Sequence, residues 1–135
     1  MPVVDASVVV SALVPRDSNH DVASRWWLLQ HVARTNLTCP AIVLAEVASA
    51  ARRATGDASF AARLVAELTS DRLLSFESTD LDHARAGAQL AADHSLKGCD
   101  AIYVALAAER GEALVTLDRE QAQRARTVVT VIVPG

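Results

Sequence analysis

Short stretches rich in β-branched and other large apolar residues alternate along the chain with longer, alanine-rich stretches. In the longer stretches, apolar residues recur at the three- and four-residue spacing of a helix. Such alternation is typical of parallel strands joined by crossover helices. The pattern therefore predicts an α/β fold with strands at residues 3–4, 37–38, 73–76, 114–116 and 128–133.

Capping residues, proline and glycine mark the ends of the predicted helices. Ser18 or Asn19 can cap a helix that runs to about residue 34, and Pro40 suits the first turn of a helix that stops at Gly56. Thr79 opens a capping-box pattern at the start of a later helix. The other helices are expected at residues 57–70, near 99–111 and shortly after 118. No repeat or linker interrupts the pattern, so residues 1–135 are expected to form a single domain.

Composition narrows the class of protein. Hydrophobic residues make up 51% of the chain and aromatic residues only 4%, so the core must be mainly aliphatic and intrinsic disorder is excluded. No apolar stretch approaches the roughly 20 residues of a membrane-spanning helix, and no signal-peptide pattern opens the chain. The two cysteines, Cys39 and Cys99, lack metal-ligand spacing. We therefore expect a cytoplasmic protein with no membrane contact.

The charge balance limits the expected mode of nucleic-acid binding. Thirteen basic and 16 acidic side chains give a net charge of −3. This value argues against a protein that holds nucleic acid by phosphate contacts alone. A cation bound among the carboxylates would reduce the repulsion of phosphate, so nucleic acid stays compatible with the composition.

Four acidic residues stand in apolar surroundings: Asp5, Glu46, Asp100 and Asp118. Asp5 and Asp118 follow predicted strands, Asp100 opens a predicted helix, and Glu46 lies in the second turn of the helix after Pro40. In an open parallel sheet, strand ends and the following helix starts meet at one edge. Each Asp alone could be only a helix cap, and Glu46 could lie on an exposed helix stripe. Together, the four residues predict a shared site at this edge.

The chemistry expected of such a site follows from its ligands. Carboxylates without nearby His or Cys favour Mg²⁺ or Mn²⁺ over Zn²⁺. Without a cation, repulsion among grouped carboxylates would oppose folding. A bound cation can polarise a phosphodiester oxygen and lower the pKa of a bound water. The site therefore favours phosphodiester chemistry.

Four segments that contain these acids resemble the acidic motifs of PIN-domain ribonucleases: Val3–Ser7, Leu44–Val47, Gly98–Ile102 and Val115–Asp118. In length and motif order the chain resembles the VapC toxins of bacterial toxin–antitoxin modules. The resemblance implies a PIN-like three-layer domain with a central parallel β-sheet flanked by helices. It also implies a Mg²⁺- or Mn²⁺-dependent endoribonuclease that cleaves RNA phosphodiesters with a metal-activated water. A cognate antitoxin that occludes the site and a homodimer are further implications.

The resemblance also assigns roles to individual residues. By motif, the catalytic and metal-binding residues are Asp5, Glu46, Asp100 and Asp118. Asp118 matches the most variable acidic position of the family, and Glu120 could share its role. Ser7 and Thr116 match hydroxyl positions where a ligand or water could be oriented. Ser7 is equally suited to capping a helix.

Two other function classes are compatible with the residues. A phosphoryl-transfer or receiver-like α/β domain also gathers Asp at strand ends, although the third predicted strand ends at Phe76-Glu77 without a phospho-acceptor Asp. A non-catalytic interaction module on the same fold is the second alternative. Adjacent Trp26 and Trp27 predict unburied apolar surface, and an antitoxin helix is expected in a groove between their helix and the helix that carries Glu46.

Overall fold

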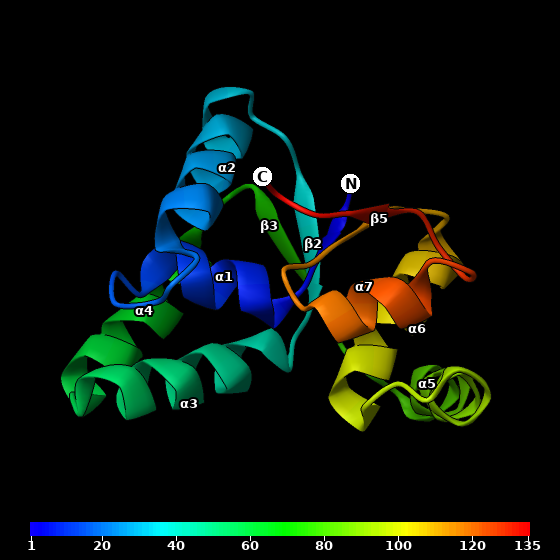
Figure 1. The fold of residues 1–135 in the computed structure, drawn as a ribbon. Helices are drawn as coiled ribbons and strands as arrows, with labels where there is room; N and C mark the ends of the chain where they lie inside the picture. Colours follow the sequence, from blue (N-terminus) through cyan, green and yellow to red (C-terminus); the bar gives the residue numbers. More distant parts are fainter.

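The computed structural model describes residues 1–135 and contains a five-stranded, entirely parallel sheet (Figure 1). In sequence order the strands are β1 (Val3–Val4), β2 (Leu37–Pro40), β3 (Leu74–Glu77), β4 (Leu114–Val115) and β5 (Val131–Ile132). Their spatial order is β3-β2-β1-β4-β5. Val3 of the central strand is in register with Thr38 of β2 and with Leu114 of β4. The predicted α/β class and parallel central sheet are confirmed.

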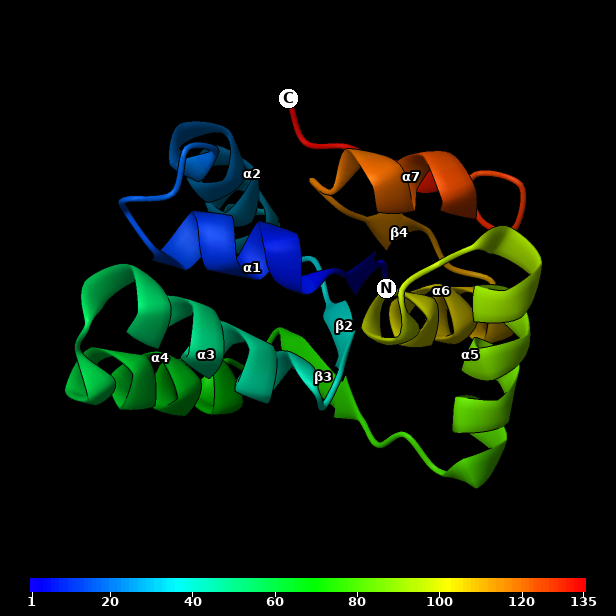
Figure 2. The same cartoon turned by 60° about the horizontal axis from the view of Figure 1, so that its bottom comes forward.

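Seven helices connect the strands. They are α1 (Ala6–Leu13), α2 (His20–Val32), α3 (Val43–Thr55), α4 (Ala58–Ser70), α5 (Leu81–His94), α6 (Gly98–Arg110) and α7 (Arg119–Ala125). Helices α1 to α4 lie on one side of the sheet, and α5 to α7 lie on the other (Figures 1 and 2). This division follows from right-handed crossovers, because the chain moves from β1 toward β3 and then crosses to β4 and β5. No helix is both long and apolar enough to cross a membrane.

Several predicted element boundaries differ from those observed. Pro40 ends β2 rather than opening a helix, and α3 begins at Val43. The cap of α5 is Asp80, whose carboxylate accepts a hydrogen bond from the backbone N–H of His83 at 2.9 Å; Thr79 does not serve as the cap. The final strand covers only Val131–Ile132.

Helix α1 was not among the predicted helices. Its consecutive residues Val8, Val9 and Val10 favour extended backbone by local propensity. Two tertiary features favour the helix instead. The side chain of Asp5 caps it, and Val8 and Val9 are buried in the core. Burial of this apolar face outweighs the weak local preference.

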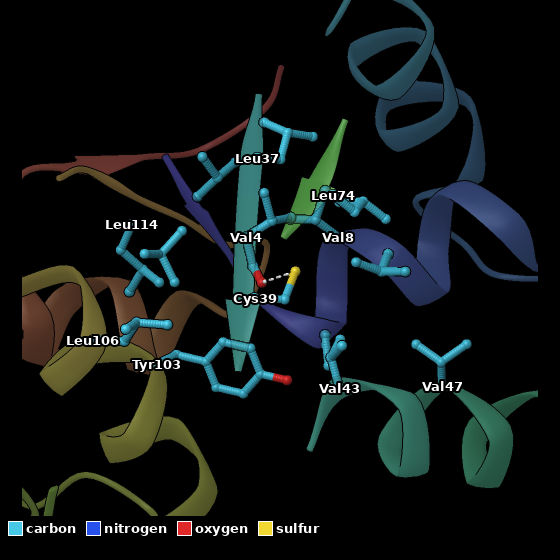
Figure 3. Close-up of a cluster of buried hydrophobic side chains, with 14 of the residues drawn as sticks. Val4, Val8, Leu37, Cys39, Val43, Val47, Leu74, Tyr103, Leu106 and Leu114 are labelled. Carbon is cyan, nitrogen blue, oxygen red and sulfur yellow. Dashed lines mark hydrogen bonds between the residues drawn. The ribbon is translucent and has the colours of Figure 1, made fainter. Parts of the chain in front are cut away.

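The core lies between the sheet and both helical layers, and it is mainly aliphatic. Val4, Leu37 and Leu114 from the sheet pack with side chains of α1, α3 and α6 (Figure 3). Tyr103 is the largest fully buried side chain, and its ring reaches from α6 toward Val43 at the start of α3 (Figure 3). An aromatic hydroxyl is thereby carried through the core to the edge where the acidic residues lie.

Candidate active site

Asp5 lies immediately after the central strand and is almost completely buried, with 4% of its surface exposed. Its Oδ2 accepts hydrogen bonds from the backbone N–H of Ser7 at 3.1 Å and from the Thr116 hydroxyl at 3.2 Å. Burial raises the pKa of Asp5, and hydrogen bonds from Ser7, Thr116 and Gln121 offset only part of that rise. A buried carboxylate with a raised pKa is one that a nearby cation would stabilise.

Asp118 lies three residues after Val115, the last residue of β4, which is the strand next to β1. Its Oδ1 accepts hydrogen bonds from the backbone N–H groups of Glu120 and Gln121, both at 3.0 Å, and so caps α7. Asp5 caps α1 in the same way. Capping and membership of a shared site are therefore compatible for both residues, because a carboxylate that accepts backbone hydrogen bonds still carries its charge.

Glu46 and Asp100 come from the two helical layers and approach the same edge. Glu46 lies in the first turn of α3, one turn earlier than predicted, and its Oε1 accepts a 2.7 Å hydrogen bond from the Tyr103 hydroxyl. Asp100 lies in the first turn of α6, where it makes no capping hydrogen bond. The capping interpretation therefore does not hold for Asp100.

The charges of the four carboxylates act on one another. Burial, together with the charges of Asp5, Asp118 and Glu46, raises the pKa of Asp100 to about 6, against a lowering effect of Lys97. Burial also raises the pKa of Glu46; the hydrogen bond from Tyr103 lowers it, and the charge of Asp5 raises it. The fold thus brings the four predicted acids into one electrostatic cluster.

Glu120 lies outside this cluster. Its carboxylate forms an ion pair with Arg124 at 2.7 Å, one turn further along α7. Of the two acids considered for the last motif, Asp118 is the one whose charge acts on Asp100.

A buried network of hydroxyl and amide groups supports the strand ends. The Ser7 and Thr116 hydroxyls are 3.3 Å apart, and each accepts a backbone N–H at 3.0 Å, from Leu117 and Asp118 respectively. Thr116 Oγ1 also lies 2.7 Å from the side-chain oxygen of Gln121. Because Thr116 has a single hydroxyl proton, it can serve either Gln121 or Asp5 at one time. Both predicted hydroxyl residues thus lie beside Asp5.

Two polar residues of the site were not predicted, namely Tyr103 and Gln121. Tyr103 is fully buried and Gln121 is 1% exposed. The Gln121 amide nitrogen lies 3.4 Å from the backbone carbonyl of Asp100, which joins α7 to the start of α6. One signal was present in the sequence: Tyr103 follows Asp100, and Gln121 follows Asp118, by the three residues that place two side chains on one helical face.

A cleft of about 620 Å³ opens beside the cluster, between α1 and α3. Glu46 and Asp118 line it together with Ser7. The groove expected between α2 and α3 is wrong, because α1 packs against both helices and the open space lies between α1 and α3. Trp26 and Trp27 are partly buried against the core, and the exposed apolar residues of α2 are Leu28, Leu29 and Val32.

The donor set fits a hydrated divalent ion such as Mg²⁺ or Mn²⁺. All four acids offer hard oxygen ligands, and neither His nor Cys joins them in a group able to enclose an ion. The carboxylates do not form a closed coordination shell either, since no three of them meet around one point. Mg²⁺ does not require such a shell, because it keeps several waters and binds through one or two carboxylates together with substrate phosphates.

Comparisons with known proteins agree with this fold. The family model of the PIN domain matches residues 3–127. VapC20 of Mycobacterium tuberculosis, a sarcin-ricin loop cleaving toxin, has a TM-score of 0.74 at 18% identity, over 84% of this chain and 87% of that chain. FitAcB from Neisseria gonorrhoeae has a TM-score of 0.71 at 20% identity, over 98% of this chain and 96% of that chain. VapBC2 from Rickettsia felis, bound to a DNA fragment from their promoter, has a TM-score of 0.71 at 12% identity, over 98% of each chain.

These comparisons carry different weight. A search of curated proteins found no match. At identities of 12% to 20%, the solved structures establish the fold alone. The family model covers nearly the whole chain and includes all four acidic motifs. The chain therefore belongs to the PIN domain family, a family of nucleases.

Proposed function

We propose that this protein is a Mg²⁺- or Mn²⁺-dependent endoribonuclease and the toxin of a type II toxin–antitoxin module. The observation that carries the proposal is the electrostatic cluster of Asp5, Glu46, Asp100 and Asp118 at the carboxyl ends of β1 and β4. The sequence order of the strands runs from β1 toward β3 on one side of the sheet and continues with β4 and β5 on the other, so the order switches between β1 and β4. Ligands of open α/β folds bind at this switch point. Membership of the PIN family argues against a receiver-like domain. The repulsion among grouped carboxylates favours a metal-dependent nuclease over a non-catalytic module on the same fold.

The surroundings of the four acids suit them to different roles in the proposed reaction. Asp5 is held rigidly by Ser7 and Thr116, so it is suited to anchor the ion. Asp118 and Asp100 supply charge from the two neighbouring helix starts. When bound, the divalent ion would activate water and neutralise charge on the scissile phosphate.

Glu46 is the acid best placed to move a proton. One of its carboxylate oxygens accepts the Tyr103 hydrogen bond, and the other has no hydrogen-bond partner. The side chain lines the open cleft, and burial raises its pKa toward the operating range of a general base. In this role Glu46 takes a proton from the attacking water.

The toxin assignment adds a cognate antitoxin that occludes the site, a homodimer and a cytoplasmic location. The likeness to VapC20 and VapBC2 supports the toxin assignment, since VapC20 is a toxin that cleaves the sarcin-ricin loop. An antitoxin that reaches the cleft between α1 and α3 would cover Glu46 and Asp118. A cationic side chain of that partner would compete with the metal for the carboxylates.

The test is cleavage of total RNA by the purified chain, free of any partner, with Mg²⁺ or Mn²⁺ and with EDTA. Asp5→Asn and Asp100→Asn are expected to abolish cleavage, because both lose the charge that would hold the ion, while Asn at position 5 keeps the oxygen that caps α1. Glu67→Gln is the matched control, since Glu67 is an exposed acid on α4 far from the cluster. Cleavage that survives EDTA, or that both Asn variants retain, contradicts the proposal.

The toxin assignment has its own test. Expression of the chain alone in bacteria is expected to arrest growth, and co-expression of the protein encoded immediately upstream is expected to restore it through a stable complex. Normal growth without a co-purifying partner would contradict the toxin assignment, but it would not contradict the proposed nuclease activity.

A further inference from the structure

One face of α3 runs from the acidic cluster to an arginine. Glu46, Ser49, Ala50 and Arg53 follow each other at helical spacing, and all four line the cleft beside α1. Seven residues separate Glu46 from Arg53, which corresponds to about 10 Å along the helix axis. An extended arginine side chain covers much of this distance, so Arg53 is within range of a phosphate that neighbours one held at Glu46 on an RNA strand.

The cleft continues past Arg53 into a second hollow of about 490 Å³. This hollow shares Arg53 and Asp17 with the first one and adds Arg16, from the loop that follows α1. Both arginines are exposed, and neither forms an ion pair. Two guanidinium groups without an ion-pair partner thus lie at the far end of a path that begins at Glu46 and Asp118.

The remaining charge on this path is Asp17. Its Oδ1 accepts a 2.9 Å hydrogen bond from the backbone N–H of Asn19, so the side chain stabilises the loop before α2. Its negative charge weakens the local field of the two arginines. Removal of an arginine from this path should therefore weaken phosphate binding, and removal of the Asp17 charge should strengthen it.

We propose that Arg53, assisted by Arg16, binds the phosphate of a nucleotide next to the scissile one, so that the RNA strand runs along α3 from Glu46 to Arg53. This inference rests on the proposed ribonuclease function. In a protein of net charge −3, an RNA strand needs a local positive site to hold it against the surrounding acids. Arginine binds phosphate through two parallel N–H groups, and such contacts position the strand without reading its sequence.

The test measures binding and cleavage separately. A fluorescent single-stranded RNA oligonucleotide is titrated with the chain in EDTA, so that affinity is read without metal or cleavage. Arg53→Ala is expected to raise the Kd about three- to tenfold at low salt, similarly for RNAs of different sequence, and to reduce the salt slope by about 0.7. In the metal-loaded protein, the same variant should raise KM and leave kcat nearly unchanged.

Two matched variants serve as controls. Arg52→Ala removes an equal charge from the adjacent residue, which is exposed but lines neither hollow. It is expected to bind RNA almost as well as the parent. Asp17→Asn keeps an oxygen for the Asn19 contact and removes the negative charge, so it should tighten RNA binding. Alanine is a strong helix former, so Arg53→Ala should fold normally.

The outcomes separate this inference from the proposed function. Equal RNA affinity of Arg53→Ala and Arg52→Ala would overturn the phosphate site, as would a loss confined to kcat. Loss of affinity for a partner protein with unchanged RNA affinity would assign the path to protein and also overturn it. A parent chain that neither binds nor cleaves RNA would refute the ribonuclease itself.

Discussion

The Tyr103 hydroxyl donates a hydrogen bond of 2.7 Å to Oε1 of Glu46, and this bond links α6 to α3 across the candidate site. The tyrosine is fully buried, and its bond is the only hydrogen bond to the Glu46 carboxylate. One side chain therefore contributes its ring to the core and its hydroxyl to the active site. The geometry of the proposed general base depends on how the core is packed.

Tyr103→Phe is expected to weaken Mn²⁺ binding several-fold with a loss of about 1 kcal/mol in the free energy of unfolding. The ring still fills its place, but Glu46 becomes free to rotate and its pKa rises further once the hydrogen bond is gone. Titration calorimetry and thermal denaturation would measure the two effects. Unchanged Mn²⁺ affinity would show that the Tyr103 hydroxyl only satisfies its own need for a hydrogen bond and plays no part in metal binding.

Asp100→Asn is expected to raise the melting temperature of the metal-free protein at neutral pH. The folded-state pKa of Asp100, about 6, lies above the ordinary value of 3.8, so the folded chain binds the proton more tightly than the unfolded chain does. The contribution of Asp100 to stability therefore falls as pH rises from about 4 to 6, and the charged form is unfavourable at pH 7. Asparagine removes this charge and, because the Asp100 side chain makes no capping bond, sacrifices no cap.

We also expect the melting temperature of Asp100→Asn to respond to metal differently from that of the parent. Mn²⁺ should raise the melting temperature of the parent, because an ion that binds only the folded state stabilises it. It should raise that of Asp100→Asn much less. Denaturation curves at pH 7 with Mn²⁺ and with EDTA test both statements, and an equal metal response in the two proteins would remove Asp100 from the ion site.

His31, which is not part of the acidic cluster, should also make the stability of the protein depend on pH. Its Nδ1 lies 2.9 Å from the Trp27 carbonyl and its Nε2 lies 2.6 Å from the Asp71 carboxylate, so both ring nitrogens face acceptors. Partial burial lowers the pKa of His31, but the hydrogen bonds to Asp71 and Trp27 and the charge of Asp71 together raise it above 6.5. The stabilisation of the folded state by protonated His31 is therefore fully present below pH 6.5, and it is lost as the pH rises through the folded-state pKa.

Asp71→Asn should remove most of that pH dependence, which is worth less than about 1 kcal/mol for a partly exposed pair. Asn retains an oxygen for the backbone N–H of Leu73, which Asp71 accepts at 2.9 Å. Urea unfolding between pH 5.5 and 8.5 would check the prediction. The same slope in the parent and in the variant would contradict it.

Thr116→Val is expected to destabilise the protein by about 2 kcal/mol and to lower activity. Valine keeps the shape but removes a hydroxyl that contacts Asp5, Gln121 and the backbone N–H of Asp118. Thr116→Ser is the control: it keeps the hydroxyl, loses one buried methyl worth about 1 kcal/mol, and should retain activity. The comparison separates the hydrogen bonds from packing, and equal activity of the two variants would contradict a role for the hydroxyl.

The acidic cluster could be predicted because each Asp stands at a strand end or helix start, where topology alone determines its position. Tyr103 and Gln121 share helical faces with Asp100 and Asp118, but this spacing alone does not assign them to the site, because a hydroxyl or amide joins a site only through tertiary contacts. Helix α1 was missed because Val8, Val9 and Val10 favour a strand locally, and only burial and the Asp5 cap reverse that preference. Without α1, the cleft between α1 and α3 could not be placed.

The central position of β1 determines when the site can form during translation. Asp5 leaves the ribosome before the neighbouring strand β4, and residues Thr116 and Asp118 follow more than a hundred residues later. Until then β1 lacks one neighbour and Asp5 lacks the Thr116 hydroxyl. Because parallel pairing joins segments distant in sequence, the nascent chain holds an incomplete site until those later residues have emerged. Assembly of the acidic cluster is thereby delayed until the sheet closes around its first strand.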